Sequence, residues 1–260
     1  MVAPPMLAAG AWDSFVPYSG LHLVTVCCCV ALIAGLLAAG RACGRARQTQ
    51  LRWLLGIFGL VYWLTYNVWW NRHGIDVVSG LPLQICDCNG VIAPFALLTQ
   101  NRWLRATLYF WAFALTTQAF IQPALQAGPS TPLFWWFWAQ HTIILGYAVF
   151  DLAVLGFRPD WRDCGRACAA GAAYLAIVVP VDLALNADYG YLGALPARQI
   201  PPFVAALGPW PLRAVVVVAL AGFAFAVAEL PWQMKRRREA AAPPASSTSA
   251  RRGAAARSVP

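Results

Sequence analysis

The chain has 260 residues, of which 60% are hydrophobic and only 11% charged, and its mean hydropathy is +0.58. Soluble domains carry about 25% charged residues, so this composition excludes an ordinary soluble protein and predicts an integral membrane protein. The formal net charge is +9. We expect no nucleic-acid partner, because the basic residues are distributed as membrane topology distributes them and not as a binding patch.

Seven apolar segments are long enough to cross a bilayer, given about 20 residues per spanning helix. They cover residues 20–39, 52–70, 81–99, 104–122, 133–155, 167–185 and 209–231. The predicted fold class is therefore all-α, a polytopic membrane protein with about seven transmembrane helices.

The basic residues predict how these helices are oriented. Of the 19 Lys and Arg residues, all except Arg72, Arg198 and Arg213 lie in the tail or in and beside the first, third and fifth loops. The positive-inside rule assigns that side to the cytoplasm. The N-terminus is then outside and the C-terminus cytoplasmic. Only one of these residues, Lys235, is a lysine, which is typical of GC-rich coding and points to a bacterial plasma membrane.

The chain divides into three predicted parts. Residues 1–19 form an extracytoplasmic N-terminal segment and residues 20–235 the seven-helix transmembrane domain. Residues 236–260 form a basic cytoplasmic tail, whose Ala-, Pro-, Ser- and Arg-rich composition predicts disorder. The first residues carry no positive stretch, so a cleaved signal peptide is not expected.

Ionisable side chains inside the predicted spans mark a candidate site. Asp87 stands between Cys86 and Cys88 in the third segment, and His141 lies in the fifth. A charged group costs about 2.5–3.5 kcal/mol at the centre of a membrane helix, so it persists where it faces a protein interior or a cavity. At 1.5 Å per residue, Cys86 lies about 8 Å and His141 about 12 Å below the outer surface.

Further polar side chains fall in the same outer half of the membrane: Gln84, Asn89, Gln118, Gln122, Asp182 and Asn186. We therefore predict one polar cavity that opens toward the outer leaflet. The alternative for each residue is structural. Gln and Asn hydrogen-bond membrane helices to one another, Asp87 pairs with His141 or Arg72, and Cys packs as a small apolar residue.

Covalent catalysis requires a nucleophile, a base and a group that orients the base. The third segment offers a thiol, His141 an imidazole at similar depth, and Asp87 or Asp182 a carboxylate to hold its tautomer. A helical wheel places Cys88 beside Asp87 and Cys86 on another face, so spacing alone leaves both cysteines as candidates. A zinc site built from the same residues lacks ligand spacing, and we expect neither a metal nor another cofactor.

Four motifs occur in order along the chain: LPLQICD at 81–87, WAQHTIILG at 138–146, NADYGYL at 186–192 and LGPWP at 207–211. Over roughly residues 52–235 they resemble the YwaF-like bacterial integral membrane proteins, which are grouped with animal transmembrane protein 164. The resemblance implies a cysteine-dependent acyltransferase that moves a fatty acyl chain between phospholipids to make ether lipids. It also implies a fold like that of the androgen-induced membrane hydrolases. It puts the nucleophile on Cys86 and the histidine on His141, and the chain departs from the usual bacterial LPLHLCD at Gln84.

The resulting hypothesis is a membrane lipid acyltransferase, or acyl hydrolase, that works in an outer-leaflet cavity. Cys86 attacks the lipid, His141 is the base, Asp87 completes the catalytic group, and the six polar residues of the outer half bind substrate. The partners are a phospholipid donor and a lysolipid acceptor, or water. The competing hypothesis is a non-enzymatic membrane protein, either a scaffold or a small-solute or proton-coupled carrier that uses Asp87, His141 and Asp182. The sequence carries no signal for a particular oligomeric state.

Overall fold

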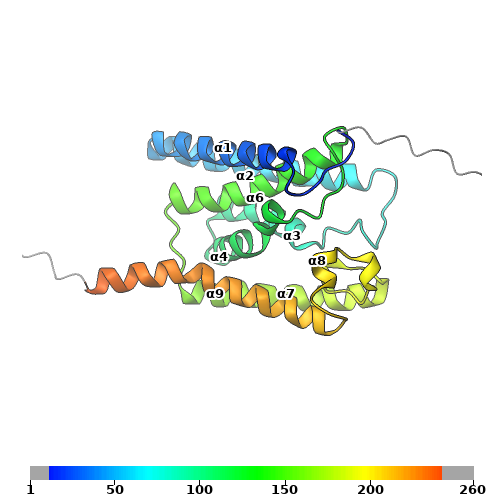
Figure 1. The fold of residues 1–260 in the computed structure, drawn as a ribbon. Coiled ribbons are helices and arrows are strands. Elements are labelled where there is room, and N and C mark those ends of the chain that lie inside the picture. Colours follow the sequence, from blue (N-terminus) through cyan, green and yellow to red (C-terminus); the bar gives the residue numbers. More distant parts are fainter. Residues whose placement is uncertain (1–11, 242–260) are drawn as a thin grey trace, which may run out of the picture.

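A computed structural model describes residues 12–241, and Figure 1 shows them as a bundle of helices. Among these residues all regular structure is helical, apart from an isolated β-bridge between Ser14 and Ala127. The predicted all-α class is therefore confirmed. The outer parts of the predicted N-terminal segment and tail, residues 1–11 and 242–260, lie outside the described residues.

Helices occupy each of the predicted segments, with shifted ends. The first is α1 (Gly20–Ala42), and the second is α2 (Arg45–Trp70). The next two segments are filled by α3 (Ile85–Thr99), α4 (Arg102–Trp111), the π-helical η1 (Ala112–Thr116) and α5 (Gln118–Ile121). They are followed by α6 (Pro132–Ala153) and α7 (Trp161–Leu185). The remainder comprises η2 (Tyr189–Tyr191), η3 (Ala197–Gln199), α8 (Pro202–Ala205) and α9 (Leu212–Ala241).

Local sequence explains where several helices begin and end. The hydroxyl of Ser19 accepts the His22 N–H and so caps α1. A capping box between Asp160 and Asp163 starts α7. Asn186 ends α7 in the left-handed conformation with φ 51°, which asparagine tolerates better than most residues.

The start of α3 differs from the prediction. It begins at Ile85 and not at residue 81, because a turn closed by the Leu83 N–H and the Leu81 carbonyl precedes it. Gln84 then has an extended backbone and serves as the N-cap residue. Cys86 consequently lies in the first helical turn of α3.

The helices form two sides with shorter helices between them. In Figure 1, α1, α2 and α6 run lengthwise along one side, and α7 and α9 run along the other. Between them, α3 contacts α2, α4 and α6, while α4 contacts α7 and α9. Fully buried Leu97, Leu108, Ile144 and Phe150 fill the core where α3, α4 and α6 meet. α3 is thus the central helix of the bundle.

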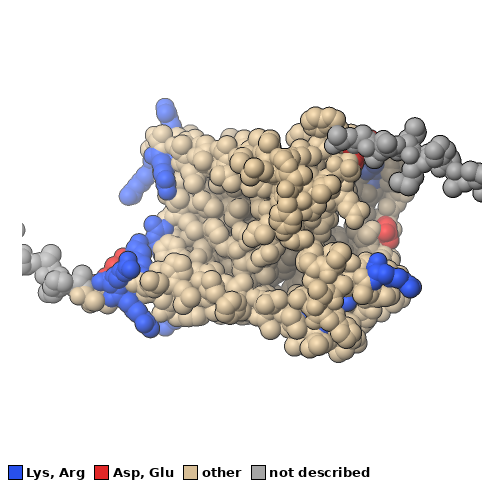
Figure 2. Space-filling model, viewed as in Figure 1, with Lys and Arg blue, Asp and Glu red and all other residues tan. Residues whose placement is uncertain are grey.

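Three of the described helices are long and apolar enough to cross a membrane, namely α1, α7 and α9. α3 is apolar but has only 15 residues, and the fourth predicted span is divided among α4, η1 and α5. Transmembrane helices are therefore supported, while seven spans and the orientation of the termini stay predictions. Figure 2 shows Lys and Arg gathered mainly at one end of the bundle, where α1 and α9 both finish.

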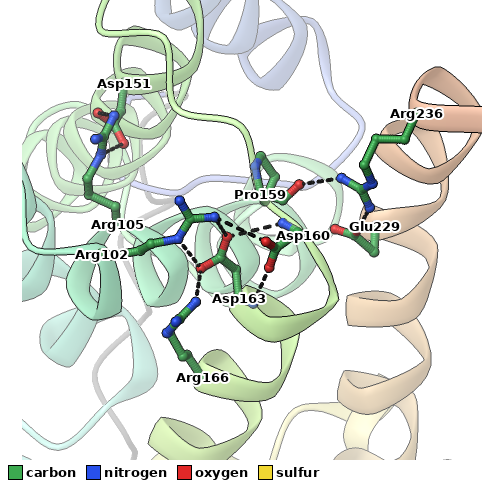
Figure 3. Close-up of polar contacts among 9 residues, drawn as sticks. All are labelled: Arg102, Arg105, Asp151, Pro159, Asp160, Asp163, Arg166, Glu229 and Arg236. Atoms are coloured by element: carbon green, nitrogen blue, oxygen red, sulfur yellow. Dashed lines mark hydrogen bonds and ion pairs between the residues drawn. The ribbon is translucent and has the colours of Figure 1, made fainter. Parts of the chain in front are cut away.

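At this end, which we call the charged end, acidic side chains pair with arginines of other turns and helices (Figure 3). The pairs are Arg102 with Asp160 and Asp163, Arg166 with Asp163, Arg105 with Asp151, and Arg236 with Glu229. The side chains of Asp163 and Glu229 are fully buried. Arg105 reaches Asp151 in a bidentate pair, with both N–O distances at 2.9 Å. The pairs of Arg102 and Arg105 link α4 to α7 and α6, while Arg236 joins α9 to the loop before α7 through the backbone oxygen of Pro159.

Candidate functional site

Cys86 lies at the start of the central helix, two residues after the N-cap residue Gln84. Its side chain is half-buried and packs against the core shared by α3, α4 and α6. The first N–H groups of a helix have no intrahelical acceptor, and the helix dipole is positive at this end. Negative charge that develops on or beside Cys86 is therefore stabilised by the backbone of α3.

Gln140 of α6 holds this first turn in place. Its Nε2 donates to Oδ1 of Asp87 at 2.9 Å and to the backbone oxygen of Cys86 at 3.1 Å. From α2, the indole N–H of Trp63 donates to the backbone oxygen of Asp87 at 2.9 Å. Gly90 leaves the space that these two side chains occupy, since a Cβ at this position would lie 3.0 Å from Trp63 and 3.3 Å from Gln140 Nε2. Two neighbouring helices, α2 and α6, thus fix the backbone around Cys86.

The π-helical segment η1 brings Thr116 to the other side of Cys86. Such segments insert an extra residue into a helix and are frequent at functional sites. Thr116 is buried, accepts a hydrogen bond from Asn89 Nδ2 at 3.3 Å, and interacts through its side chain with the Cys86 thiol. Oδ1 of Asn89 is buried and has no hydrogen-bond partner among the described residues. Leaving such an oxygen unpaired costs about 1–3 kcal/mol, so a donor from a ligand or water is favoured here.

His141 is buried on α6, and its described contacts are with Phe137 and Phe120. Its Nδ1 lies 2.7 Å from the backbone oxygen of Phe137. Because a carbonyl oxygen only accepts, Nδ1 carries the proton and the neutral ring keeps its lone pair on Nε2. The ring packs on Phe137 with centroids 4.2 Å apart and meets the edge of Phe120 at 6.5 Å. Among the described residues no hydrogen bond joins His141 to Cys86 or Asp87, and its role as a base stays a prediction.

The two candidate cysteines have different surroundings. The Cys88 thiol donates to the backbone oxygen of Pro82 at 3.7 Å and packs against the core cluster that contains Phe110 and Trp111. The Cys86 side chain instead packs against the core shared by α3, α4 and α6, with the side chain of Thr116 nearby. Each cysteine thus has one polar neighbour and an apolar core beside it, and the choice of Cys86 as nucleophile stays a prediction.

The loop after α7 covers the start of α3. The Gly190 N–H donates to Oε1 of Gln84 at 3.0 Å, and the Leu81 N–H donates to the Tyr189 hydroxyl at 3.1 Å. Asp182 accepts the Tyr189 N–H through Oδ1 at 2.8 Å, while its Oδ2 is buried without a partner among the described residues. Gln84 therefore joins two segments of the chain.

The four sequence motifs are connected in space by hydrogen bonds. Gln140 joins 138–146 to 81–87, and Gln84 joins 81–87 to 186–192. The indole N–H of Trp210 donates to the backbone oxygen of Leu192 at 3.2 Å and so joins the motif at 207–211 to the motif at 186–192. Segments that are distant in sequence thus share one neighbourhood, as residues of a common site must.

A cavity of about 390 Å³ opens beside Gln84 and Asp87. Tyr66 and Trp70 of α2 and Asp188 of the loop after α7 form part of its wall. Burial raises the pKa of the Asp188 carboxyl, although the Gly193 N–H and Arg213 act in the opposite direction. The cavity gives access to the first turn of α3 from the end of the bundle where these loops lie.

Three predicted substrate-binding residues make no described contact with this turn. Gln118 is exposed, Asn186 is exposed at the end of α7, and Gln122 accepts a hydrogen bond from the Tyr18 hydroxyl. The structure brings Gln84, Asp87 and Asn89 to Cys86 and connects Asp182 through Tyr189, while these three lie apart. A role in substrate binding stays a prediction for all of them.

Two residues beside Cys86, Gln140 and Thr116, are absent from the site that the sequence predicts. Gln140 is visible in the sequence as a polar residue inside an apolar segment, and its position beside His141 is the signal that could select it. Thr116 carries no such signal, because threonine is common in membrane helices and nothing in the sequence predicts the π-helical turn that positions it.

The fold and the site define the class, which is an all-helical membrane protein with a cysteine at the start of its central helix. The profile of the TMEM164 family matches residues 17–228, which is most of the chain. The chain belongs to the TMEM164 family, and the resemblance to transmembrane protein 164 is confirmed. No curated protein and no solved structure matches the chain.

Proposed function

We propose that this protein is a lipid acyltransferase or acyl hydrolase with Cys86 as nucleophile and His141 as base. One observation carries the proposal: hydrogen bonds connect all four motifs to one another around the turn that holds Cys86. A turn held by α2, α6 and the loop after α7 is a rigid setting for a reacting thiol, and precise positioning is a large part of enzymatic rate enhancement.

The proposed reaction has two acyl transfers. His141 Nε2 takes the Cys86 proton, and the thiolate attacks the carbonyl carbon of a phospholipid ester. The ester C–O bond breaks, the lysolipid oxygen leaves with the proton from His141, and the acyl chain remains as a thioester on Cys86. A second lysolipid hydroxyl, or water, then attacks the thioester while His141 takes its proton, and the thiol is restored. In each step, the free N–H groups of the first turn of α3 donate hydrogen bonds to the oxyanion that forms on the carbonyl oxygen.

The membrane setting of the site makes lipid the expected substrate, and the orientation of the protein decides which leaflet supplies it. We place the protein as a multi-pass protein of a bacterial plasma membrane, with the cavity beside Gln84 and Asp87 toward the outer leaflet and the charged end in the cytoplasm. Support comes from the gathering of basic side chains at the end opposite the motif loops (Figure 2). A phosphatase fused to the C-terminus, active only outside the cytoplasm, is expected to be silent. An active fusion would reverse the orientation.

Mass spectrometry tests the covalent step. The purified protein is incubated with phospholipid, digested and searched for a fatty acyl adduct, which is expected on Cys86. Cys86→Ala is expected to lose both the adduct and lipid turnover, whereas the matched control Cys88→Ala keeps most of both. His141→Ala is expected to slow turnover by about 10²- to 10⁴-fold, the usual contribution of a general base. If Cys86→Ala retains turnover, the covalent mechanism is wrong and the carrier hypothesis takes its place.

A further inference from the structure

A second concave surface lies at the charged end, between α6 and α9. It is a groove of about 370 Å³ lined by Leu152, Ala153, Arg158, Pro231, Trp232 and Lys235. Gln140, which contacts the Cys86 turn, lies twelve positions before Leu152, or about 18 Å along α6 at the helical rise. The groove is therefore separate from the proposed acyltransferase site, and nothing in that reaction uses it.

Two cations converge on one aromatic ring in this groove. The guanidinium carbon of Arg158 lies 5.4 Å from the centroid of the Trp232 ring, and Lys235 Nζ lies 5.8 Å from the same centroid. Each contact is a favourable cation–π interaction. The two positive charges nevertheless repel each other, and an anion bound between them removes that repulsion.

The groove has no acidic lining residue, and the carboxylates near it are engaged elsewhere. Asp151, Asp160, Asp163 and Glu229 are all paired within the network of Figure 3. The ion pair that Lys235 makes with Glu239 is 3.9 Å long and exposed on both sides, so it contributes little. The groove thus retains a net positive charge.

Arg158 is held in a fixed position for binding. Its Nη1 donates to the backbone oxygens of Leu152 at 2.7 Å and Phe157 at 2.8 Å. Its other guanidinium nitrogens have no hydrogen-bond acceptor among the described residues. A planar guanidinium that is already positioned loses less freedom when it binds a phosphate oxygen.

We propose that this groove binds the phosphate headgroup of an anionic phospholipid. Arg158 and Lys235 contact the phosphate, the indole of Trp232 lies at the depth of the headgroups, and Leu152, Ala153 and Pro231 face the start of the acyl chains. Basic pockets beside membrane helices are a general mode of recognition for anionic lipids. The groove lies at the end of the bundle where basic side chains gather, which is where lipid headgroups meet a spanning helix.

Native mass spectrometry of the delipidated, full-length protein tests the proposal, with phosphatidylglycerol and phosphatidylcholine as probes. The wild-type protein is expected to bind phosphatidylglycerol in preference. Lys235→Glu is expected to weaken phosphatidylglycerol binding by about tenfold or more, since each basic residue near an anionic membrane contributes a comparable amount. Arg237→Glu is the matched control: it makes the same charge change on an exposed residue of α9 outside the groove and is expected to keep the wild-type affinity.

A second variant protects the test against loss of folding. Arg158→Gln keeps donors for the two carbonyl oxygens and removes the charge, and it is expected to weaken phosphatidylglycerol binding while the protein stays folded. Equal losses in Lys235→Glu and Arg237→Glu would overturn the proposal, because binding would then follow total charge. Full displacement of the lipid by millimolar inorganic phosphate would also overturn it, because a free anion would then be the preferred ligand.

Discussion

The two ends of the helix bundle satisfy their buried polar groups in different ways. At the charged end, carboxylates meet arginines directly, and buried Asp163 has two of them. At the other end, which we call the motif end because the four motifs meet there, amide, indole and backbone N–H groups supply neutral hydrogen bonds. The cavity of the motif end lies beside these groups.

The buried atoms without partners show the same contrast. At the motif end, Asn89 Oδ1 and Asp182 Oδ2 are buried without a hydrogen-bond partner among the described residues. At the charged end the same holds for Glu229 Oε2, Arg105 Nη2 and Asp151 Oδ1, although the last two atoms lie 2.9 Å apart in an ion pair. The remaining oxygen of Glu229 is paired with Arg236, whereas Asn89 and Asp182 have no ion pair among the described residues. Buried acceptors without a partner are rare in native structures and call for an explanation, and a bound ligand or water is one. We therefore expect substitutions at the charged end to affect mainly stability and substitutions at the motif end to affect mainly the proposed chemistry.

The largest effect is expected at the charged end. Arg105→Met leaves the buried Asp151 carboxylate without its bidentate partner, and breaking a buried ion pair from one side costs about 3–5 kcal/mol. The free energy of unfolding, measured by denaturant titration in detergent, is expected to fall by this amount. Lipid turnover per folded molecule is expected to stay unchanged, because Cys86 belongs to the motif end.

The double variant Arg105→Met with Asp151→Leu provides the control. It removes both charges and fills the space with apolar side chains, so most of the lost stability is expected to return. If the double variant is as unstable as the single one, the packing of α4 on α6 and not the unpaired charge is responsible.

An intermediate effect is expected at the motif end from Gly90→Ala. The new Cβ would lie 3.0 Å from Trp63 and 3.3 Å from Gln140 Nε2, so Gln140 must move away from the Cys86 turn. Overpacking of this kind costs about 1–3 kcal/mol. We expect a larger fractional loss of acyl transfer than of folded protein, measured by turnover and by unfolding of the same preparation.

Gly171→Ala is the matched control for this substitution. Gly171 lies within α7 and a Cβ there meets nothing within 4 Å, so alanine is expected to be neutral or to stabilise by up to about 1 kcal/mol. A Gly90→Ala protein with wild-type turnover would mean that the Gln140 contact does not support the site.

The helices could be predicted from the sequence because long apolar runs alone are enough to define them. The motif end was predicted in outline, since Asp87 and the nearby amides mark it by being polar inside apolar segments. The sequence does not predict the details that depend on tertiary contacts. Gln140 and His141 are adjacent and point about 100° apart, and only the packing of α6 decides that Gln140 faces Asp87. The π-helical turn at Thr116 and the start of α3 at Ile85 likewise depend on tertiary packing and not on local sequence.

The smallest effect concerns Asp188, in the wall of the cavity. Burial raises its pKa in the folded protein, so it favours the protonated form, and its contribution to stability is lost as pH rises through that pKa. Asp188→Asn keeps an oxygen for the Gly193 N–H and removes the charge. At neutral pH we expect a gain of about 0.5 kcal/mol in the free energy of unfolding, which shrinks as pH falls.

Asp76→Asn is the control with the opposite sign, because the Ser79 hydroxyl and the Val78 N–H lower the pKa of Asp76. Its carboxylate contributes stability that is present at neutral pH and lost in acid, so this variant is expected to lose stability at neutral pH and to approach the wild-type protein as pH falls. A loss of stability in Asp188→Asn at neutral pH would mean that attraction to Arg213 outweighs the burial of the charge.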